Sequence, residues 1–308
     1  MKHTLLAGLI ALCSLPAPAV FAAEKPGKPI LKATRIEKEL RAKTKYGYAL
    51  VRGHSRAGQK AQRFELRHGD CGGNKYWSDC TSDRQRIERK EDPKDRIQKV
   101  NSQTWYGWSF YLNPDFRDIG PGNITLGQVK MQDWLMPLWH FNMRDDKAMM
   151  WFGADGGCTV GRVSKLRGRW QDILIFADYS LSPKGPSFIM YLNGKQVCSR
   201  NKPMVTRHML DQSQQKLFFK YGLYNSYVSR WLDRNKTQTV TAIPFKDQHT
   251  TRTGSSKTSN SASSTPFAYD WGVKLPTQVV YYDEMRYGKS RAQVDIRVLE
   301  AAGAKPVD

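Results

Sequence analysis

The chain has 308 residues, and its 49 lysines and arginines against 28 acidic residues give a formal net charge of +21. This length allows one large β-domain or two small ones, and after the N-terminal segment no stretch reaches the roughly 20 apolar residues of a membrane-spanning helix. The charge attracts polyanions, whether nucleic acid, an anionic membrane surface or an acidic polysaccharide. A basic surface that is simply solvated, with no specific partner, is the alternative.

The first residues have the pattern of a secretory signal peptide. Met1–His3 carries a positive charge, Leu5–Val20 is apolar apart from one serine and two prolines, and the small residues Ala22 and Ala23 precede a polar segment. A charged start, an apolar centre and a small-residue cleavage site indicate export. We therefore expect residues 1–22 to be removed and the protein to be periplasmic or secreted. A buried N-terminal helix is the alternative, which the two prolines disfavour.

A basic segment, residues 23–45, follows, and we expect it to lie as an arm along the folded domain, with Lys32–Ala42 helical. The chain then continues as short runs rich in Val, Ile, Tyr, Phe and Trp, separated by Gly, Pro, Asn and Asp. Such runs without alternating helices predict an antiparallel sandwich or barrel. The predicted strands include Tyr46–Val51, Thr104–Leu112, Thr125–Met131, Pro137–Met143, Ala148–Phe152, Asp172–Tyr179, Ser187–Leu192, Lys216–Tyr224 and Gln278–Tyr287.

Residues 46–308 are expected to form a single domain. Asn193-Gly194 predicts a tight hairpin, because both central residues of a type I′ turn need a positive φ. Val205–Gln214 is a second candidate helix. Residues 248–266 are rich in Ser and Thr and poor in apolar side chains, so they are expected to be a mobile inserted loop. Such a loop could serve as a lid over a binding site or only as a passive connection.

Four cysteines remain once the signal segment is removed, and an even number in an exported protein favours disulfides. We expect Cys71–Cys80 to close a Gly-rich loop and Cys158–Cys198 to join two strands. No cysteine and histidine spacing typical of zinc is present. We expect no cofactor, although a structural calcium ion held by oxygen ligands leaves little trace in a sequence.

Strand parity gathers polar side chains on single faces, since alternate residues of a strand point to opposite sides. In 217–225 the apolar face, suited to the core, consists of Phe219, Tyr221 and Leu223. The other face carries Lys220, Gly222 and Tyr224, and the small glycine leaves an open floor between the ammonium and the phenol. Four further segments show polar faces: Arg84, Arg86 and Glu88; Arg63, Glu65 and Arg67; Gln128 and Lys130; His140 and Asn142.

Phe218–Asn225 resembles the Tyr-Phe-Lys-x-Gly-x-Tyr-Asn motif of the family 7 alginate lyases and the related heparin lyase I-like polysaccharide lyases. Their Arg-x-Glu-Leu motif is matched letter for letter by Arg63–Leu66 and more loosely by Arg86–Glu88. Leu126–Val129 is similar to their Gln-Ile-His strand, with Lys130 at the position of the histidine. The resemblance spans roughly residues 46–290. It implies an all-β fold, an antiparallel concanavalin-like β-jelly-roll whose concave sheet binds the sugar chain.

The resemblance also implies a reaction, β-elimination at a uronic acid. The proton on C5 is very weakly acidic beside a carboxylate, so the enzyme must neutralise that carboxylate; Gln128 with Arg86 or Arg63 suits this task. A base then takes the proton and an acid protonates the leaving oxygen. Tyr224 suits one or both roles, because nearby cations favour the phenolate.

The remaining roles follow from the same chemistry. If the family histidine is the base, its role is vacant here, and either Tyr224 does both transfers or His140 substitutes. Glu88 or Glu65 would hold the arginine. The residues expected to bind substrate are Lys220, Lys130, Arg63, Arg67, Arg84, Glu88 and Asn142.

The expected partner is an acidic polysaccharide, such as alginate, glucuronan, a heparin-like glycan or a bacterial exopolysaccharide, bound by a monomer. A lectin-like protein of the same fold is the main alternative, since it would keep the cationic groove without an activated tyrosine. A glycoside hydrolase needs two facing carboxylates, and no strand supplies such a pair. We expect no nucleic acid as partner, because no groove-reading motif is present. No Gly-x-Ser-x-Gly motif supports a serine hydrolase.

Overall fold

A computed structural model describes residues 24–36, 44–73, 78–235 and 273–308 of the chain. The predicted signal peptide and the predicted inserted loop at 248–266 lie outside these residues, so both stay predictions. None of the helices in the described ranges is long and apolar enough to cross a membrane.

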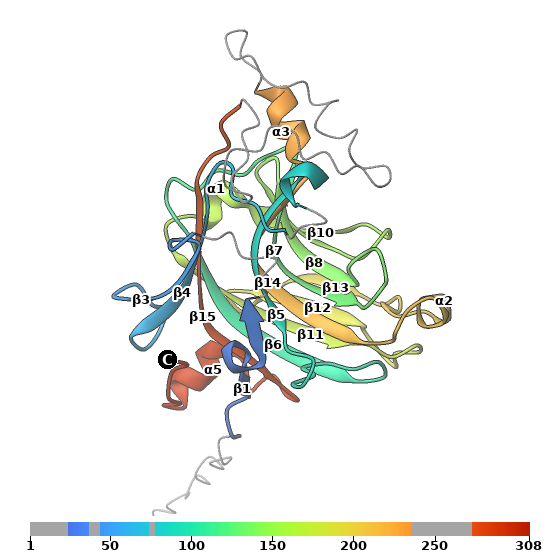
Figure 1. The fold of residues 1–308 in the computed structure, drawn as a ribbon. Helices are drawn as coiled ribbons and strands as arrows, with labels where there is room; N and C mark the ends of the chain where they lie inside the picture. The colour runs from blue at the N-terminus through green and yellow to red at the C-terminus, as the bar shows by residue number, and fades with distance from the viewer. Residues whose placement is uncertain (1–23, 37–43, 74–77, 236–272) are drawn as a thin grey trace, which may run out of the picture.

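Two antiparallel sheets form the body of the domain (Figure 1). The eight-stranded sheet has the order β13-β12-β11-β6-β15-β4-β3, and β1 also pairs with β15. Its strands are β1 (Lys28–Pro29), β3 (Tyr48–Arg52), β4 (Lys60–Leu66), β6 (Gln103–Leu112), β11 (Trp170–Asp178), β12 (Phe188–Leu192), β13 (Lys195–Arg200) and β15 (Gln278–Gly288).

The seven-stranded sheet has the order β10-β9-β8-β7-β14-β5-β2. Its strands are β2 (Thr34–Ile36), β5 (Arg84–Glu91), β7 (Asn123–Met131), β8 (Trp139–Arg144), β9 (Lys147–Trp151), β10 (Gly157–Arg162) and β14 (Leu217–Ser226). Every strand predicted from the sequence is present, with ends that differ by a few residues. The all-β sandwich prediction is confirmed.

The core between the sheets is aromatic, and strand parity explains its composition. Phe219 and Tyr221 of β14 are fully buried, and Phe219 lies 5.6 Å from the ring of Tyr106 on β6. The ring centroids of Phe64 on β4 and Tyr221 are 5.7 Å apart. Burying one such side chain stabilises a fold by about 1.5–3 kcal/mol. These contacts fix which face of β14 points into the core and therefore which face is left for function.

Short helices and 3-10 turns lie between the strands and after the last of them. The α-helices are α1 (Val163–Leu166), α2 (Arg207–Asp211), α3 (Val228–Arg234) and α5 (Ile296–Ala301), and the 3-10 turns are η1 (Ile30–Ala33) and η3 (Cys80–Ser82). In Figure 1, α3 lies at one end of the molecule, and α5 lies at the other end near β1. The prediction of a helix within Val205–Gln214 is confirmed by α2.

The predicted helix Lys32–Ala42 is wrong for Thr34–Ile36: Lys32 and Ala33 end the 3-10 turn η1, and residues 37–42 lie outside the described ranges. Thr34–Ile36 is strand β2, which pairs with β5 in the register Thr34↔Glu91 and Ile36↔Arg89. Both Thr34 and Ile36 are β-branched and fit a strand better than a helix. The open edge of β5 offers backbone hydrogen bonds, and these override the weak helical pattern. Residues 28–36 thus contribute one short strand to each sheet.

Both predicted disulfides are present. Cys71–Cys80 joins two cysteines nine positions apart in the loop just before β5. Cys158 on β10 and Cys198 on β13 join edge strands of the two different sheets. The second bridge therefore ties the two layers together at one side of the sandwich.

Candidate active site

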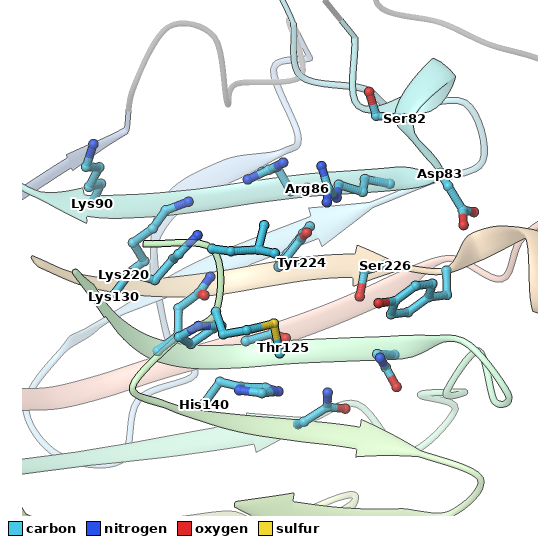
Figure 2. Close-up of a pocket in the computed structure, with 18 of the residues that line it drawn as sticks. Ser82, Asp83, Arg86, Lys90, Thr125, Lys130, His140, Lys220, Tyr224 and Ser226 are labelled. Atoms are coloured by element: carbon cyan, nitrogen blue, oxygen red, sulfur yellow. The ribbon is translucent and has the colours of Figure 1, made fainter. Parts of the chain in front are cut away.

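A groove of about 740 Å³ lies on the seven-stranded sheet, on the face opposite the core. It is lined from β5, β14, β7 and β8, and by the turn at Ser82 and Asp83. Eight of the residues predicted for the site line it: Arg84, Arg86, Gln128, Lys130, His140, Asn142, Lys220 and Tyr224. Figure 2 shows Lys90, Lys130 and Lys220 toward one end, Asp83 and Ser226 at the other, and Arg86 and Tyr224 between them.

Strand register explains why these side chains meet. Tyr224 on β14 lies opposite Arg86 on β5 and Thr125 on β7. Lys220 lies opposite Gln128, and Gln128 lies opposite His140 on β8. Directly opposite residues in an antiparallel pair place their side chains close together on one face. Residues that are far apart in the sequence therefore form two polar rows across four strands.

Gly222 has a role different from the predicted open floor. Its φ is +137°, a conformation that side chains disfavour, and a Cβ at this position would run into the carbonyl oxygen of Ile87 on β5. The register between β14 and β7 shifts in the same place, between Tyr221 and Tyr224. Glycine is required here by the backbone of an irregular strand. The irregularity sets how Tyr224 is placed relative to Lys220.

Glu88 is the buried centre of the site. Its Oε1 accepts a hydrogen bond of 2.7 Å from Nε2 of Gln128, and its Oε2 lies 2.6 Å from Nζ of Lys220. Nη1 of Arg86 is 3.7 Å away. Burial alone would raise the pKa of Glu88, but Lys220 and Arg86 bring it below the ordinary value. The ionised carboxylate thus holds the amide and the ammonium in place at the floor of the groove.

Asp79 is a site residue that the sequence analysis missed. It is fully buried, and its carboxylate accepts hydrogen bonds from Nε of Arg86 at 2.9 Å and from Nη2 at 2.6 Å. Asp79 precedes Cys80, whose disulfide anchors the loop. Asp79 lies in a loop, where alternation along a strand cannot predict the direction of a side chain. Only its contact with Arg86 in the folded structure reveals it. This pair fixes the direction in which the guanidinium of Arg86 points.

Tyr224 lies directly under that guanidinium, with Cζ of Arg86 4.4 Å from the centroid of its ring. Burial raises the pKa of Tyr224 above its ordinary value, and Arg86 and Arg84 oppose this only in part. The expectation that neighbouring cations favour the phenolate is therefore wrong in its net direction, because the ring is removed from water more than the cations compensate. Tyr224 carries its proton at neutral pH.

Lys130 and His140 also have shifted pKa values. Burial, reinforced by the like charge of Lys220, lowers the pKa of Lys130 to about 8. Burial lowers the pKa of His140 to about 4, so its imidazole is neutral near pH 7. Nδ1 of His140 is buried and has no hydrogen-bond partner among the described residues. Because the neutral ring also lines the groove, it can accept a proton from a ligand bound there.

The structure does not bring Arg63 and Arg67 to the groove. Arg63 lies on β4 of the other sheet, where Phe64 points into the core, so Arg63 and Glu65 point away from it. Glu65 forms ion pairs with Arg63 and Arg67 on that far face. The predicted substrate-binding role of Arg63 and Arg67 at this site is therefore wrong. Arg86–Glu88, the looser match, occupies the place beside β14.

Apolar side chains at the groove were also missed. Leu135 is 83% exposed, Met136 39% and Tyr227 48%, and all three line the groove. Exposed apolar side chains of this size beside a cavity mark a binding surface. Their signal in the sequence is weak, because the apolar pair Leu135-Met136 could equally well be buried against the core. Within the described residues, no group of three or more His, Cys, Asp and Glu side chains could hold a metal ion.

Comparison with known proteins supports one family. The family model described as "Polysaccharide lyase" matches residues 31–286. The fold is similar to the endo-β-1,4-glucuronan lyase of the fungus Trichoderma reesei, with 16% identity, coverage of 88% of this chain and 96% of that one, and a TM-score of 0.54. An alginate lyase of polysaccharide lyase family 7 is 13% identical, with coverage of 85% and 96% and a TM-score of 0.47.

No curated protein matches the sequence significantly. At 16% identity the glucuronan lyase shows only that the fold is shared, whereas the family model covers most of the chain, including every strand that lines the groove. The chain belongs to the polysaccharide lyase family.

Proposed function

We propose that the protein is exported and cleaves a uronate-containing polysaccharide by β-elimination in the groove of the seven-stranded sheet. The observation that carries this proposal is that a protonated phenol, Tyr224, lines the same groove as an amide, Gln128, and a guanidinium, Arg86. These are the groups that elimination beside a carboxylate requires. Export rests on the signal pattern of the first 22 residues.

In this mechanism the substrate carboxylate lies against Gln128 and Arg86. Gln128 has two amide hydrogens, of which one reaches Glu88. The guanidinium is oriented by Asp79. As the C5–H bond breaks, its electrons form the C4=C5 double bond and the bond from C4 to the bridging oxygen breaks. Negative charge that builds up on the carboxylate is stabilised by these fixed donors.

Tyr224 gives its proton to the departing oxygen, since it is protonated before the reaction begins. His140 receives the C5 proton. Its imidazole is neutral in the free protein, and a bound uronate places a negative charge nearby, which favours the imidazolium and makes the ring a stronger base. The products are a shortened chain and a new end with an unsaturated uronate.

Glucuronan and alginate are the first substrates to test, because the proteins of similar fold are described as lyases of these two polymers. Purified mature protein is incubated with glucuronan, alginate and heparin while ultraviolet absorbance is followed. We expect absorbance from the unsaturated uronate to rise with at least one of them. A flat trace on all three, together with salt-sensitive binding, would instead indicate a lectin-like protein.

Substitution of His140 by glutamine is expected to lower kcat by about a hundredfold, within the range for loss of a general base. Added imidazole should restore part of the rate by entering the space left by the ring. His208→Gln is the matched control, because His208 is exposed and does not line the groove. An unchanged kcat for His140→Gln would transfer the base role to Tyr224.

The pH dependence tests Lys130. Its pKa is lowered to about 8, so its positive charge, which would attract a substrate carboxylate, is present below that pH and lost above it. We expect kcat/KM, which reports the free enzyme, to fall as the pH rises through about 8. In Lys130→Arg this fall should disappear, because a guanidinium stays charged. If kcat/KM of the variant fell over the same pH range, the fall would have to be assigned to another titrating group.

A further inference from the structure

A second cavity of about 310 Å³ adjoins the groove at its lysine end. Lys90 and Phe218 line both spaces, so the second cavity continues the first. Nζ of Lys90 lies 4.5 Å from the centroid of the Phe218 ring, and this pair forms the junction. The rest of its lining comes from the end of β5 and the connection to β6, from Gln132 after β7, and from the residues at the start of β14 and just before it.

The lining of this second cavity is cationic where it faces solvent. Arg96, Lys99 and Lys216 are exposed, and none of the three forms an ion pair in the described part of the chain. Lys216 reaches only the side-chain oxygen of Gln214, at 3.4 Å. Unpaired cations around a concave space raise the local concentration of anions.

The two carboxylates of the lining are already engaged. Glu91 is buried and accepts hydrogen bonds from the backbone N–H groups of Ile97 at 2.6 Å and Phe219 at 2.8 Å. Asp92 pairs with Arg35 at 3.2 Å. Glu91 therefore fixes the loop that carries Arg96 and Lys99 against β14, so the cations are held at a defined place beside the groove.

The separation from the reacting groups determines what can bind here. Lys216 lies just before β14, eight residues ahead of Tyr224, which corresponds to about 26 Å of extended chain. One sugar unit cannot reach both. An anion in the second cavity must therefore belong to a sugar several units away from the cleaved bond.

We propose that the second cavity is a distal subsite for a carboxylate of the same polysaccharide chain. This inference rests on the proposed function and goes further: the enzyme cleaves a long chain with repeated charges more efficiently than a fragment too short to reach the second cavity. Phe218 then supports the sugar that passes from the groove to the subsite, as partly exposed aromatic rings do.

The test combines Arg96→Gln, Lys99→Gln and Lys216→Gln in one variant. A control variant carries Arg169→Gln, Lys184→Gln and Lys202→Gln, which remove the same charge from exposed positions outside both linings. For each, kcat/KM is measured on the polymer that wild type cleaves fastest among glucuronan, alginate and heparin. The same is measured on its size-fractionated oligosaccharides, beginning with the shortest that is cleaved.

We expect the subsite variant to lose about tenfold in kcat/KM on the polymer, equivalent to about 1.4 kcal/mol, mainly through KM. On the shortest cleaved oligosaccharide it should match wild type, and the control should match wild type at every length. Equal losses at all lengths, no loss on the polymer, or the same loss in the control would overturn the proposal. The last result would mean that only overall charge matters.

Failure of the proposed function gives a separate result, because wild type would then release no unsaturated uronate from any polymer. In that case elution from immobilised alginate on a salt gradient still decides the binding part of the inference. Earlier elution of the subsite variant than of the control supports an anion site in the second cavity, and identical elution overturns it.

Discussion

Tyr224→Phe is expected to remove most of the turnover while leaving substrate affinity close to that of wild type. In the proposed mechanism the phenol gives its proton to the departing oxygen, and loss of a general acid lowers kcat by about 10²–10⁴-fold. The phenylalanine ring keeps the contact under Arg86, which lies 4.4 Å from the present ring. The Arg86–Asp79 pair and the floor formed by Glu88 should therefore keep their geometry. The measurement is initial rate by ultraviolet absorbance, with binding measured in parallel.

Tyr191→Phe is the matched control for this prediction, because Tyr191 also lies under an arginine, with Cζ of Arg291 4.7 Å from its ring centroid, but stands on β12 of the other sheet and does not line the groove. Its loss of a hydroxyl should leave kcat within about twofold of wild type, as expected for a side chain outside the reaction. If Tyr224→Phe retained most of the activity while His140→Gln lost it, the proton donor would have to be sought elsewhere in the groove. If binding fell as strongly as turnover, Tyr224 would serve to hold the substrate.

Much of the fold was predictable because the strands are short, apolar and regularly interrupted. Parity in β14 assigned Phe219 and Tyr221 to the core and Lys220 and Tyr224 to the opposite face, as the structure shows. Parity is a local rule, and it holds wherever one face of a strand is buried. What it cannot supply is the identity of the neighbouring strand.

The site was predicted less completely for that reason. Arg63 and Arg86 stand in similar alternating segments, and nothing local shows that β4 joins one sheet and β5 the other. That outcome depends on pairing between strands remote in the sequence. Asp79 lies outside any strand, and Gly222 owes its place to a backbone irregularity. Shifts in pKa, such as that of Tyr224, depend on burial that only the assembled sandwich creates.

Arg86 and Arg63 therefore make the sharpest paired test of the site. Arg86→Lys is expected to lower kcat by about 10²–10³-fold, the cost of removing one oriented donor to the charge that builds up in the transition state. Lysine keeps the positive charge opposite Asp79 and Glu88, so the buried carboxylates stay compensated. It lacks the planar fork that engages Asp79 through two nitrogens while facing the substrate.

Arg63→Lys, the same chemical change in the closer match to the family motif, should leave kcat and KM unchanged, because Arg63 pairs with Glu65 on the far face of the other sheet. Thermal unfolding of both variants separates lost chemistry from lost stability. A strong loss in Arg63→Lys with normal stability would mean that the far face takes part in the reaction. Full activity in Arg86→Lys would mean that charge alone at this position suffices, and Gln128 would then be the donor that discriminates the transition state from bound substrate.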